Sequence, residues 1–253
     1  MDVVTEGLPL FVRRTLAIAK KNAKIYYIKP PVIIFGLLFP FVMFLAFAIG
    51  RGIDPALLTP RILGVTVLFT ASAVGPLIAP WERMMKTYER LLTAPLSLWN
   101  ILLGDIISGV FFGVIIALAP LLVGLIFFEA VVVNYLLFLV ALLLAVFCFS
   151  ALGSLMSALP TELPANVMML SNLIRFPLLF ISGVFIPWEN MPHWAQTLAY
   201  LSPLTYAVDL FRWSFGEGNN IPLWLSCLLL VIFAGLFVWW AKKAHEKGIK
   251  MLY

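Results

Sequence analysis

The sequence predicts an all-α integral membrane protein with six transmembrane helices, and three observations lead to that fold class. Hydrophobic residues make up 63% of the 253 residues and charged residues 11%, whereas soluble domains are about half apolar and about one quarter charged. Several apolar runs of about 20 residues are each long enough to cross roughly 30 Å of hydrocarbon as a helix. These runs do not alternate apolar and polar residues, which excludes a membrane β-barrel.

The apolar segments that meet this length requirement give the expected spans. They lie at about 31–50, 62–80, 106–128, 135–159, 167–187 and 221–241. Only the fifth contains a formal charge, Arg175. The stretches between the spans are too short to fold as soluble domains. We therefore expect residues 1–253 to form a single transmembrane domain, and we expect no cleaved signal peptide because the N-terminus lacks a basic-then-apolar leader.

The distribution of Lys and Arg predicts the orientation. One group of segments carries most of the basic residues: Arg13, Arg14, Lys20, Lys21, Lys24, Lys29, Arg83, Lys86, Arg90, Lys242, Lys243, Lys247 and Lys250. The alternate segments carry only Arg51, Arg61 and Arg212. Positive charge stays cytoplasmic, so we expect both termini inside and the loop 188–220 outside, in the cell membrane. Six spans put both basic termini on one side, and one span more or fewer would separate them.

The first extramembrane element is an amphipathic helix over residues 8–28. Phe11, Ile18 and Ile25 recur every seven residues on one face, and the basic side chains cluster opposite them. Such a helix rests its apolar face in the headgroup layer. A topology-fixing anchor and a contact for a partner are both consistent with this pattern.

The loop 81–98 is the second element, and its residues 82–92 have helical character. Glu82 and Lys86 form a favourable pair one turn apart, and Pro95 ends the helix. Met84, Leu91 and Leu92 give it an apolar side, which would be unfavourable in water unless it docks on something. Docking against a separate partner is the preferred interpretation, and docking against the chain's own spans is the alternative.

The third element is the stretch 183–212, which is rich in aromatic residues and interrupted by Pro187, Pro192 and Pro203. Each proline lacks an amide donor and crowds the preceding turn, so we expect short broken helices. The aromatic rings favour the boundary between lipid and water. The stretch is therefore expected to enter the outer membrane surface as a re-entrant segment.

Several classes of site are excluded by what the sequence lacks. The two cysteines lie inside apolar runs and have neither metal-ligand nor disulfide spacing. No phosphate-binding loop, zinc-protease motif or nucleophile elbow occurs, so we expect no catalytic residue, no metal and no cofactor bound by this chain. The net charge of +5 is better matched by anionic membrane lipids than by nucleic acid, because no basic groove with stacking aromatics is present.

Two motifs make the resemblance to a known family specific. Glu82-Arg83, Thr87, Glu89-Arg90-Leu91-Leu92 and Pro95 resemble the coupling helix of the permease subunits of type-2 ABC exporters (ABC-2 type membrane proteins). A second motif resembles the signature of that family after span five: Ser182-Gly183, Pro187, Pro192, Pro203-Leu204-Thr205-Tyr206 and Arg212. The likeness covers the whole topology. Lys86 departs from it, because the family often has a small residue there, and so does Arg175, where an apolar residue is usual.

The resemblance implies a permease subunit that moves an amphipathic or lipid-like substrate out of the cytoplasm or inner leaflet: a drug, lipid, glycolipid or polysaccharide. ATP and Mg²⁺ would bind to a separate ABC ATPase subunit, and a second permease copy or paralogue would complete the transporter. The residues expected to dock on the ATPase are Glu82, Arg83, Glu89, Arg90, Leu91 and Leu92.

In this family the substrate path lies between the two permeases, along spans two and five. Asn172, Arg175, Phe176 and Leu179 share one face of span five by helical spacing. A charge inside the membrane costs free energy, so Arg175 is expected to meet an anionic or carbonyl group of the substrate. The alternative is a structural pairing with a backbone carbonyl or a neighbouring helix.

An external gate is expected at the exit of the path, formed by Gly183, Pro187, Trp188, Trp194 and Tyr206. Trp188, Trp194 and Tyr206 would anchor it in the outer headgroup layer, while Gly183 would act as a hinge or as a close-packing site.

Two other functions remain open at this level. A membrane scaffold or sensor that binds an ATPase without moving cargo would share the same topology and loop. A channel or secondary transporter would have no ATPase partner. The sequence names neither the substrate nor the second permease.

Overall fold

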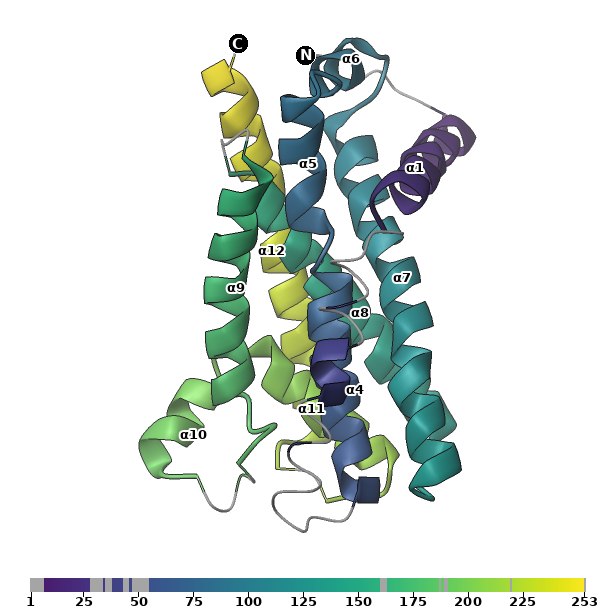
Figure 1. The fold of residues 1–253 in the computed structure, drawn as a ribbon, viewed down its shortest axis with the longest axis vertical. Coiled ribbons are helices and arrows are strands. Elements are labelled where there is room, and N and C mark those ends of the chain that lie inside the picture. The colour runs from purple at the N-terminus through teal and green to yellow at the C-terminus, as the bar shows by residue number, and fades with distance from the viewer. Residues whose placement is uncertain are drawn as a thin grey trace.

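Every regular element that the computed structural model describes is helical. The description covers residues 7–27, 34, 38–42, 46, 55–159, 163–186, 188, 191–218 and 220–252. Its elements are α1 (Leu8–Asn22), the π-helix η1 (Ala23–Tyr27), α4 (Pro55–Ala71), α5 (Gly75–Met84), α6 (Tyr88–Thr93), α7 (Leu98–Phe127), α8 (Tyr135–Ser157), α9 (Pro164–Ile181), α10 (His193–Ala199), α11 (Pro203–Ser214) and α12 (Leu223–Leu252). The long helices run side by side along the length of the molecule (Figure 1).

Five candidate membrane spans occur among the described residues. They are Ala56–Met84, Leu98–Phe127, Tyr135–Ser157, Pro164–Ile181 and Leu223–Gly248. They correspond to the second to sixth predicted spans, so the multi-pass helical architecture is confirmed. Most of the predicted first span, 31–50, lies outside the described residues.

The second predicted span differs most from expectation. Instead of one helix over 62–80, it consists of α4 and α5, separated by a break at residues 72–74. It is the most deeply buried of the five candidate spans. α4 contacts α7, α8 and α11, and α5 contacts α8 and α9. The interrupted span is therefore the centre of the described bundle.

Side-chain caps define where the flanking helices begin. Ser97 Oγ accepts from the amide of Asn100, whose own side chain accepts from the amide of Ser97, and this capping box starts α7. The side chain of Asn134 accepts from the amide of Leu137 at the start of α8. α7 therefore begins two turns before the predicted span, which brings Asp105 inside the helix.

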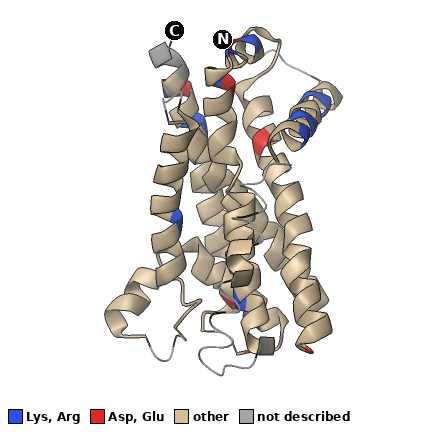
Figure 2. Cartoon of the chain, viewed as in Figure 1, with Lys and Arg blue, Asp and Glu red and all other residues tan. Residues whose placement is uncertain are grey.

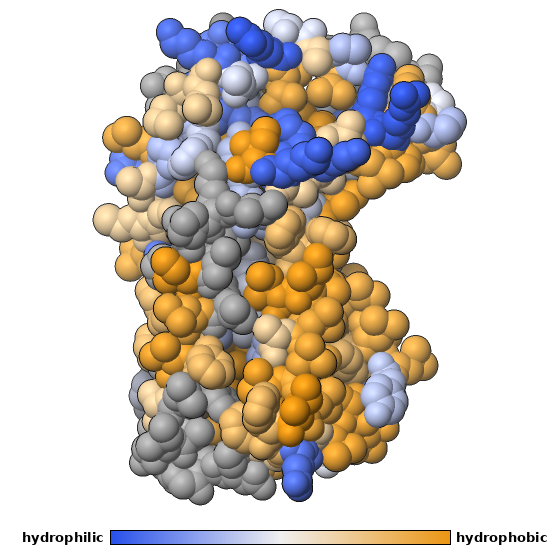
Figure 3. All heavy atoms as spheres, turned by 45° about the vertical axis from the view of Figure 1, so that its right-hand side comes forward, coloured by the Kyte–Doolittle hydropathy of each residue, from blue (hydrophilic) through white to orange (hydrophobic). Residues whose placement is uncertain are grey.

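Charge is segregated along the bundle. Most of the described Lys and Arg residues lie toward the end of the molecule that carries α1, α6 and the C-terminal part of α12 (Figure 2). On the face shown in Figure 3, apolar side chains make up most of the described surface below that basic end. Exposed leucine, isoleucine, phenylalanine and tryptophan side chains on α7, α8, α9 and α12 contribute to the apolar surface. This pattern suits a lipid environment, in which exposed apolar surface carries no cost.

The stretch between the last two spans contains two short helices, as the prolines predict. α10 lies near the surface, whereas α11 is buried against α4, α8 and α12. Both lie at the end of the bundle opposite α6 (Figure 1).

Candidate functional site

The 81–98 loop follows α5, the second half of the interrupted span. The predicted helix over 82–92 is interrupted, because α5 ends at Met84 and α6 begins at Tyr88. Backbone amides of residues 85, 86 and 87 close the turn by donating to the carbonyls of Trp81, Arg83 and Glu82. Lys86 at the turn has φ 54°, a left-handed conformation that side chains other than glycine adopt at a cost. Glycine would adopt this conformation without that cost.

The exposed surface of this loop is apolar in its centre and charged at its edge. Met84 is 49% exposed and Met85 63%, and Lys86, Glu89 and Arg90 are also exposed. Thioether side chains adapt to varied partner surfaces. Leu91 and Leu92 are half-buried, so the apolar part of the surface comes from the two methionines more than from the predicted leucines.

Arg83 holds the loop to the rest of the chain. Its guanidinium donates to the carbonyl of Leu159 at 2.6 Å and lies 5.3 Å from the centre of the Tyr88 ring. Burial raises the pKa of Tyr88 to about 12, so the phenol is neutral beneath the guanidinium. The half-buried Arg83 therefore braces the loop, with little of its side chain presented to a partner.

Glu82 points into the protein, contrary to the expectation that it forms part of an exposed docking surface. It is 3% exposed, and its carboxylate accepts from the ammonium of Lys21 and, at 3.4 Å, from the hydroxyl of Tyr26. Burial and the neighbouring Glu82 raise the pKa of Tyr26, which keeps its hydroxyl a donor. Glu82 thus ties α5 to the N-terminal helix.

The N-terminal helix docks on α7 through small and polar side chains. Asn22 Nδ2 donates to Asp105 Oδ1 at 2.6 Å, and Asn100 Nδ2 donates to Thr15 Oγ1 at 3.2 Å. Gly104 lets the two helices approach, because a Cβ there would lie 2.6 Å from Ile18 Cγ2. Of the predicted apolar face, Ile18 is therefore buried against α7 and Ile25 stays exposed. The helix is part of the fold as well as a candidate for the membrane surface.

The break in the central span has a local cause. In a continuous helix the amide of residue 76 would donate to the carbonyl of residue 72, but residue 76 is proline. Next to the break, Gly75 packs directly on α8, because a Cβ there would lie 2.7 Å from the carbonyl carbon of Gly153. Two glycine backbones therefore meet at the break.

Arg175 lies at the same break. It is 1% exposed; one guanidinium nitrogen donates to the carbonyl of Ser72, and the other donates to Asn172 Oδ1 at 3.2 Å. This geometry matches the alternative role, pairing with a backbone carbonyl, rather than contact with a substrate.

The other residues of the predicted path are also partly or fully buried inside the chain. Leu179 is buried, while Asn172 and Phe176 are half-buried. Phe176 packs against Phe69 of α4, with ring centres 5.8 Å apart. The opposite side of α9 is apolar and exposed, and it comprises Met169, Leu170, Leu173, Ile174 and Phe180. The four predicted residues thus share a face, and that face packs against this chain's own central span.

Some residues of the predicted gate lie at the surface of the protein, and others lie in its core. Trp194 is 69% exposed, and Trp188 is half-buried with its ring 5.4 Å from that of Tyr200. Tyr206 does not lie at the surface as expected: it is 2% exposed, and its hydroxyl donates to the carbonyl of Tyr200 at 2.6 Å. Pro187 lies outside the described residues.

The backbone conformation at residue 183, rather than close packing, accounts for a glycine at this position. Its φ is +79°, and the nearest atom to an added Cβ would be Met191 Cε at 3.6 Å, an ordinary contact. Of the two expected roles, the space around it therefore does not support a packing site.

Ionic contacts fasten this end of the bundle. Glu217 accepts from Arg212 at 2.8 Å and from Arg61 of α4 at 3.1 Å. The carboxylate of Asp209 accepts from the amide of Asn220 at 2.9 Å. α11 and the loop that follows it are thereby held against α4.

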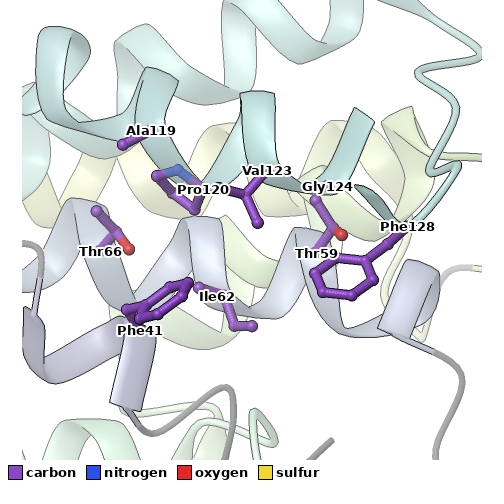
Figure 4. A pocket seen from close by; sticks show the side chains of 9 residues that line it. All are labelled: Phe41, Thr59, Ile62, Thr66, Ala119, Pro120, Val123, Gly124 and Phe128. Carbon is purple, nitrogen blue, oxygen red and sulfur yellow. The ribbon is translucent and has the colours of Figure 1, made fainter. Parts of the chain in front are cut away.

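An apolar pocket lies between α4 and α7 (Figure 4). Its lining comprises Phe41, Thr59, Ile62, Thr66, Ala119, Pro120, Val123, Gly124 and Phe128. The lining carries no charge, and it includes none of the predicted path residues. Aliphatic and aromatic walls of this kind do not distinguish among apolar groups.

Comparison with known proteins identifies the family. Residues 13–215, well over half of the chain, match the family model described as ABC-2 type transporter. This chain belongs to the ABC-2 type transporter family. It is accordingly a multi-pass membrane permease subunit, as the two sequence motifs predict.

Individual relatives are named as transport permeases. The chain is 25% identical over 170 residues to the inner membrane transport permease YadH of Escherichia coli (strain K12), which covers 66% of each protein. It is 29% identical over 203 residues to the putative transport permease ycf38 of Cyanophora paradoxa, covering 69% of this chain and 65% of the relative. It is 25% identical over 179 residues to the probable multidrug ABC transporter permease YbhR of Escherichia coli (strain K12), covering 69% and 48%. The chain thus spans just under two thirds of YadH and ycf38 and about half of YbhR.

Sequence reasoning found the 81–98 loop of this permease but missed the distant partners that hold this loop and the N-terminal helix in place. Lys21, Asn22 and Asp105 form contacts across 61 and 83 residues of sequence, and no local pattern marks such pairs. One feature of the sequence did point to such a contact. Pro76 lies inside a predicted span, and a proline there leaves the carbonyl four residues earlier, that of Ser72, without its helical donor. Among the described residues, no group of three or more His, Cys, Asp and Glu side chains could hold a metal ion.

Proposed function

We propose that this permease is the membrane subunit of an ATP-driven exporter of amphipathic or lipid-like molecules, energised by a separate ABC ATPase that binds at the 81–98 loop. The observation that carries the proposal is the exposed Met84 and Met85 surface, edged by Lys86, Glu89 and Arg90, at the end of the most buried span. An adaptable apolar centre with charges at its rim suits a protein interface.

The basic end of the bundle supports an orientation with both termini cytoplasmic. Lys and Arg gather where α1, α6 and the end of α12 lie (Figure 2), and positive charge is retained on the cytoplasmic side. The 81–98 loop would then face ATP, and α10 and α11 would face outward. The segment 188–220 would form a re-entrant gate at the exit, with Trp194 in the headgroup layer.

The ATPase drives transport only if ATP favours one arrangement of the permease over another, since a ligand with equal affinity for both shifts neither. α5 connects the loop directly to the centre of the bundle. Closure of two ATPase subunits would move the loop, and α5 would carry that motion to the break at residues 72–74.

A second permease copy or paralogue would complete the path. The exposed apolar side of α9 would face the path and the partner, and Asn172 and Phe176 lie at its edge. The name of YbhR, a probable multidrug transporter permease, supports an amphipathic cargo.

The test is reconstitution. Tagged permease is purified with its nucleotide-binding subunit and placed in vesicles, and ATP-dependent movement of a fluorescent phospholipid and of a fluorescent amphipathic drug is measured. We expect vectorial movement of at least one probe. In Met85→Asp, retention of the ATPase should fall by roughly tenfold or more, as for loss of a central interface contact. Tyr135→Asp, exposed at the opposite end, is the matched control.

A membrane scaffold or sensor is the second candidate, because the same loop would bind an ATPase in either case. ATP hydrolysis that responds to the permease without movement of either probe, in vesicles sealed to both, would favour it. Purification of an active transporter with no nucleotide-binding subunit would contradict both.

A further inference from the structure

We propose that Arg175 is a positioning residue that links the ATPase-coupled half of the interrupted span, α5, to α9. This inference rests on the proposed function and adds a transmission step to it. It begins with the carbonyl of Ser72, which lies at the break between α4 and α5 and belongs to a fully buried residue.

Pro76 creates the need for a donor. A proline at residue 76 cannot supply the amide that residue 72 requires in a continuous helix, and an unsatisfied carbonyl away from water is costly. The guanidinium of Arg175 donates to that carbonyl from a different helix. A residue that is 103 positions away in sequence thus replaces the donor that the proline removed.

The guanidinium is oriented from its own helix. Asn172 lies one turn earlier on α9, and its side-chain oxygen accepts from the other guanidinium nitrogen at 3.2 Å. A charge-assisted hydrogen bond is directional and stronger than a neutral one. Phe176 of α9 packs against Phe69 of α4, and a contact between two apolar rings imposes no comparable direction. The Arg175 bond therefore fixes the register of α9 against the break.

The break is the point about which α5 would turn in this proposal. Gly75 and Gly153 meet backbone to backbone beside it, so α5 has a pivot without intervening side chains. α5 contacts α9 more extensively than α4 does. When the 81–98 loop moves, α5 turns about this pivot, and Arg175 transfers the movement to α9 and its exposed apolar side.

The experiment distinguishes two roles of Arg175: transferring movement from α5 to α9, and only supplying a hydrogen-bond donor to the carbonyl of Ser72. Single fluorophores are attached to Thr93→Cys on α6 and, in a second sample, to Leu173→Cys on α9, both exposed, after Cys148 and Cys227 are replaced by alanine. The permease–ATPase complex in lipid nanodiscs is compared without nucleotide and with ATP and vanadate. Both reporters should respond in the parent protein.

Arg175→Met should leave the α6 response intact and reduce the α9 response by roughly tenfold or more, as expected for loss of a charged hydrogen bond. Arg175→Lys keeps a charged donor group and should retain at least about half of the α9 response. Pro76→Ala combined with Arg175→Met restores a backbone donor to Ser72, so thermal stability should recover while the α9 reporter stays silent.

If the α9 reporter responds in Arg175→Met or in the double variant as strongly as in the parent protein, the proposal is overturned. Arg175 would then only satisfy the carbonyl of Ser72. If Arg175→Met does not assemble with the ATPase, the α9 responses of the double variant and of Arg175→Lys test the proposal. The double variant should give no α9 response, and Arg175→Lys should retain at least about half of it. Silence of both reporters in the parent complex would instead overturn ATP coupling, and with it the proposed function.

Discussion

Two residues in or beside the family motifs have a backbone conformation that favours glycine. Lys86 and Gly183 both have positive φ, 54° and 79°. Glycine adopts this region freely, whereas an L side chain pays about 1–2 kcal/mol. The motif glycine after span five is therefore required for a turn, and Lys86 carries a strain that a glycine would not.

Gly183→Ala should destabilise the permease by about 1–2 kcal/mol through backbone strain alone, since an added methyl group would meet no close atom. SDS denaturation in mixed micelles measures the loss. Gly235→Ala, at an open helical position with no atom within 4 Å, is the control and should be neutral or slightly stabilising. Equal stability of Gly183→Ala and the parent protein would refute the strain argument.

The Lys21–Glu82 pair is the second feature at this scale. The Glu82 side chain is 4% exposed and that of Lys21 30%, so Lys21 is partly solvated and the pair is not wholly buried. Glu82→Gln should cost about 1–3 kcal/mol.

Exchanging the two charges tests whether Lys21 and Glu82 interact directly. Lys21→Glu and Glu82→Lys should each destabilise the protein, and the double exchange should recover at least about half of the summed loss if the two charges interact directly. The same SDS denaturation supplies all four free energies. Additive losses would show that each residue acts through other neighbours.

At the scale of elements, the N-terminal helix is both amphipathic and docked. Arg13 and Lys20 are exposed, while Thr15, Ile18, Ala19 and Asn22 are buried against the bundle. The sequence pattern predicted an apolar face but could not assign it to lipid or to protein, because both environments exclude water.

Gly104→Ala should displace this helix from α7. The added Cβ would lie 2.6 Å from Ile18 Cγ2 and 3.1 Å from the carbonyl of Thr15, and overpacking of this kind costs about 1–3 kcal/mol. Trypsin cleavage at the lysines of α1 should accelerate, by about tenfold for each 1.4 kcal/mol of lost docking. Unchanged cleavage, with Gly235→Ala as the reference, would mean that the interface relaxes around the methyl group.

At the scale of the whole molecule, the segregation of charge predicts a single orientation. In intact cells, a membrane-impermeant maleimide should label Trp194→Cys on exposed α10 but not Thr93→Cys on α6, which should react only after permeabilisation. Both positions are exposed, so accessibility to the reagent depends on the side of the membrane. The reverse labelling pattern would invert the topology and move the 81–98 loop away from cytoplasmic ATP.

The sequence by itself determined the membrane class, the second to sixth helical spans, the basic end and the two family motifs, because hydrophobicity, charge and proline act locally along a chain. The tertiary structure decided what Glu82, Tyr206 and Arg175 do. Each was expected at a surface or a path, and each is buried with a partner inside the chain. In the case of Arg175, a proline breaks one helix and a distant arginine supplies the missing donor. Such a pairing depends on which helices meet, and that is a property of packing rather than of any sequence window.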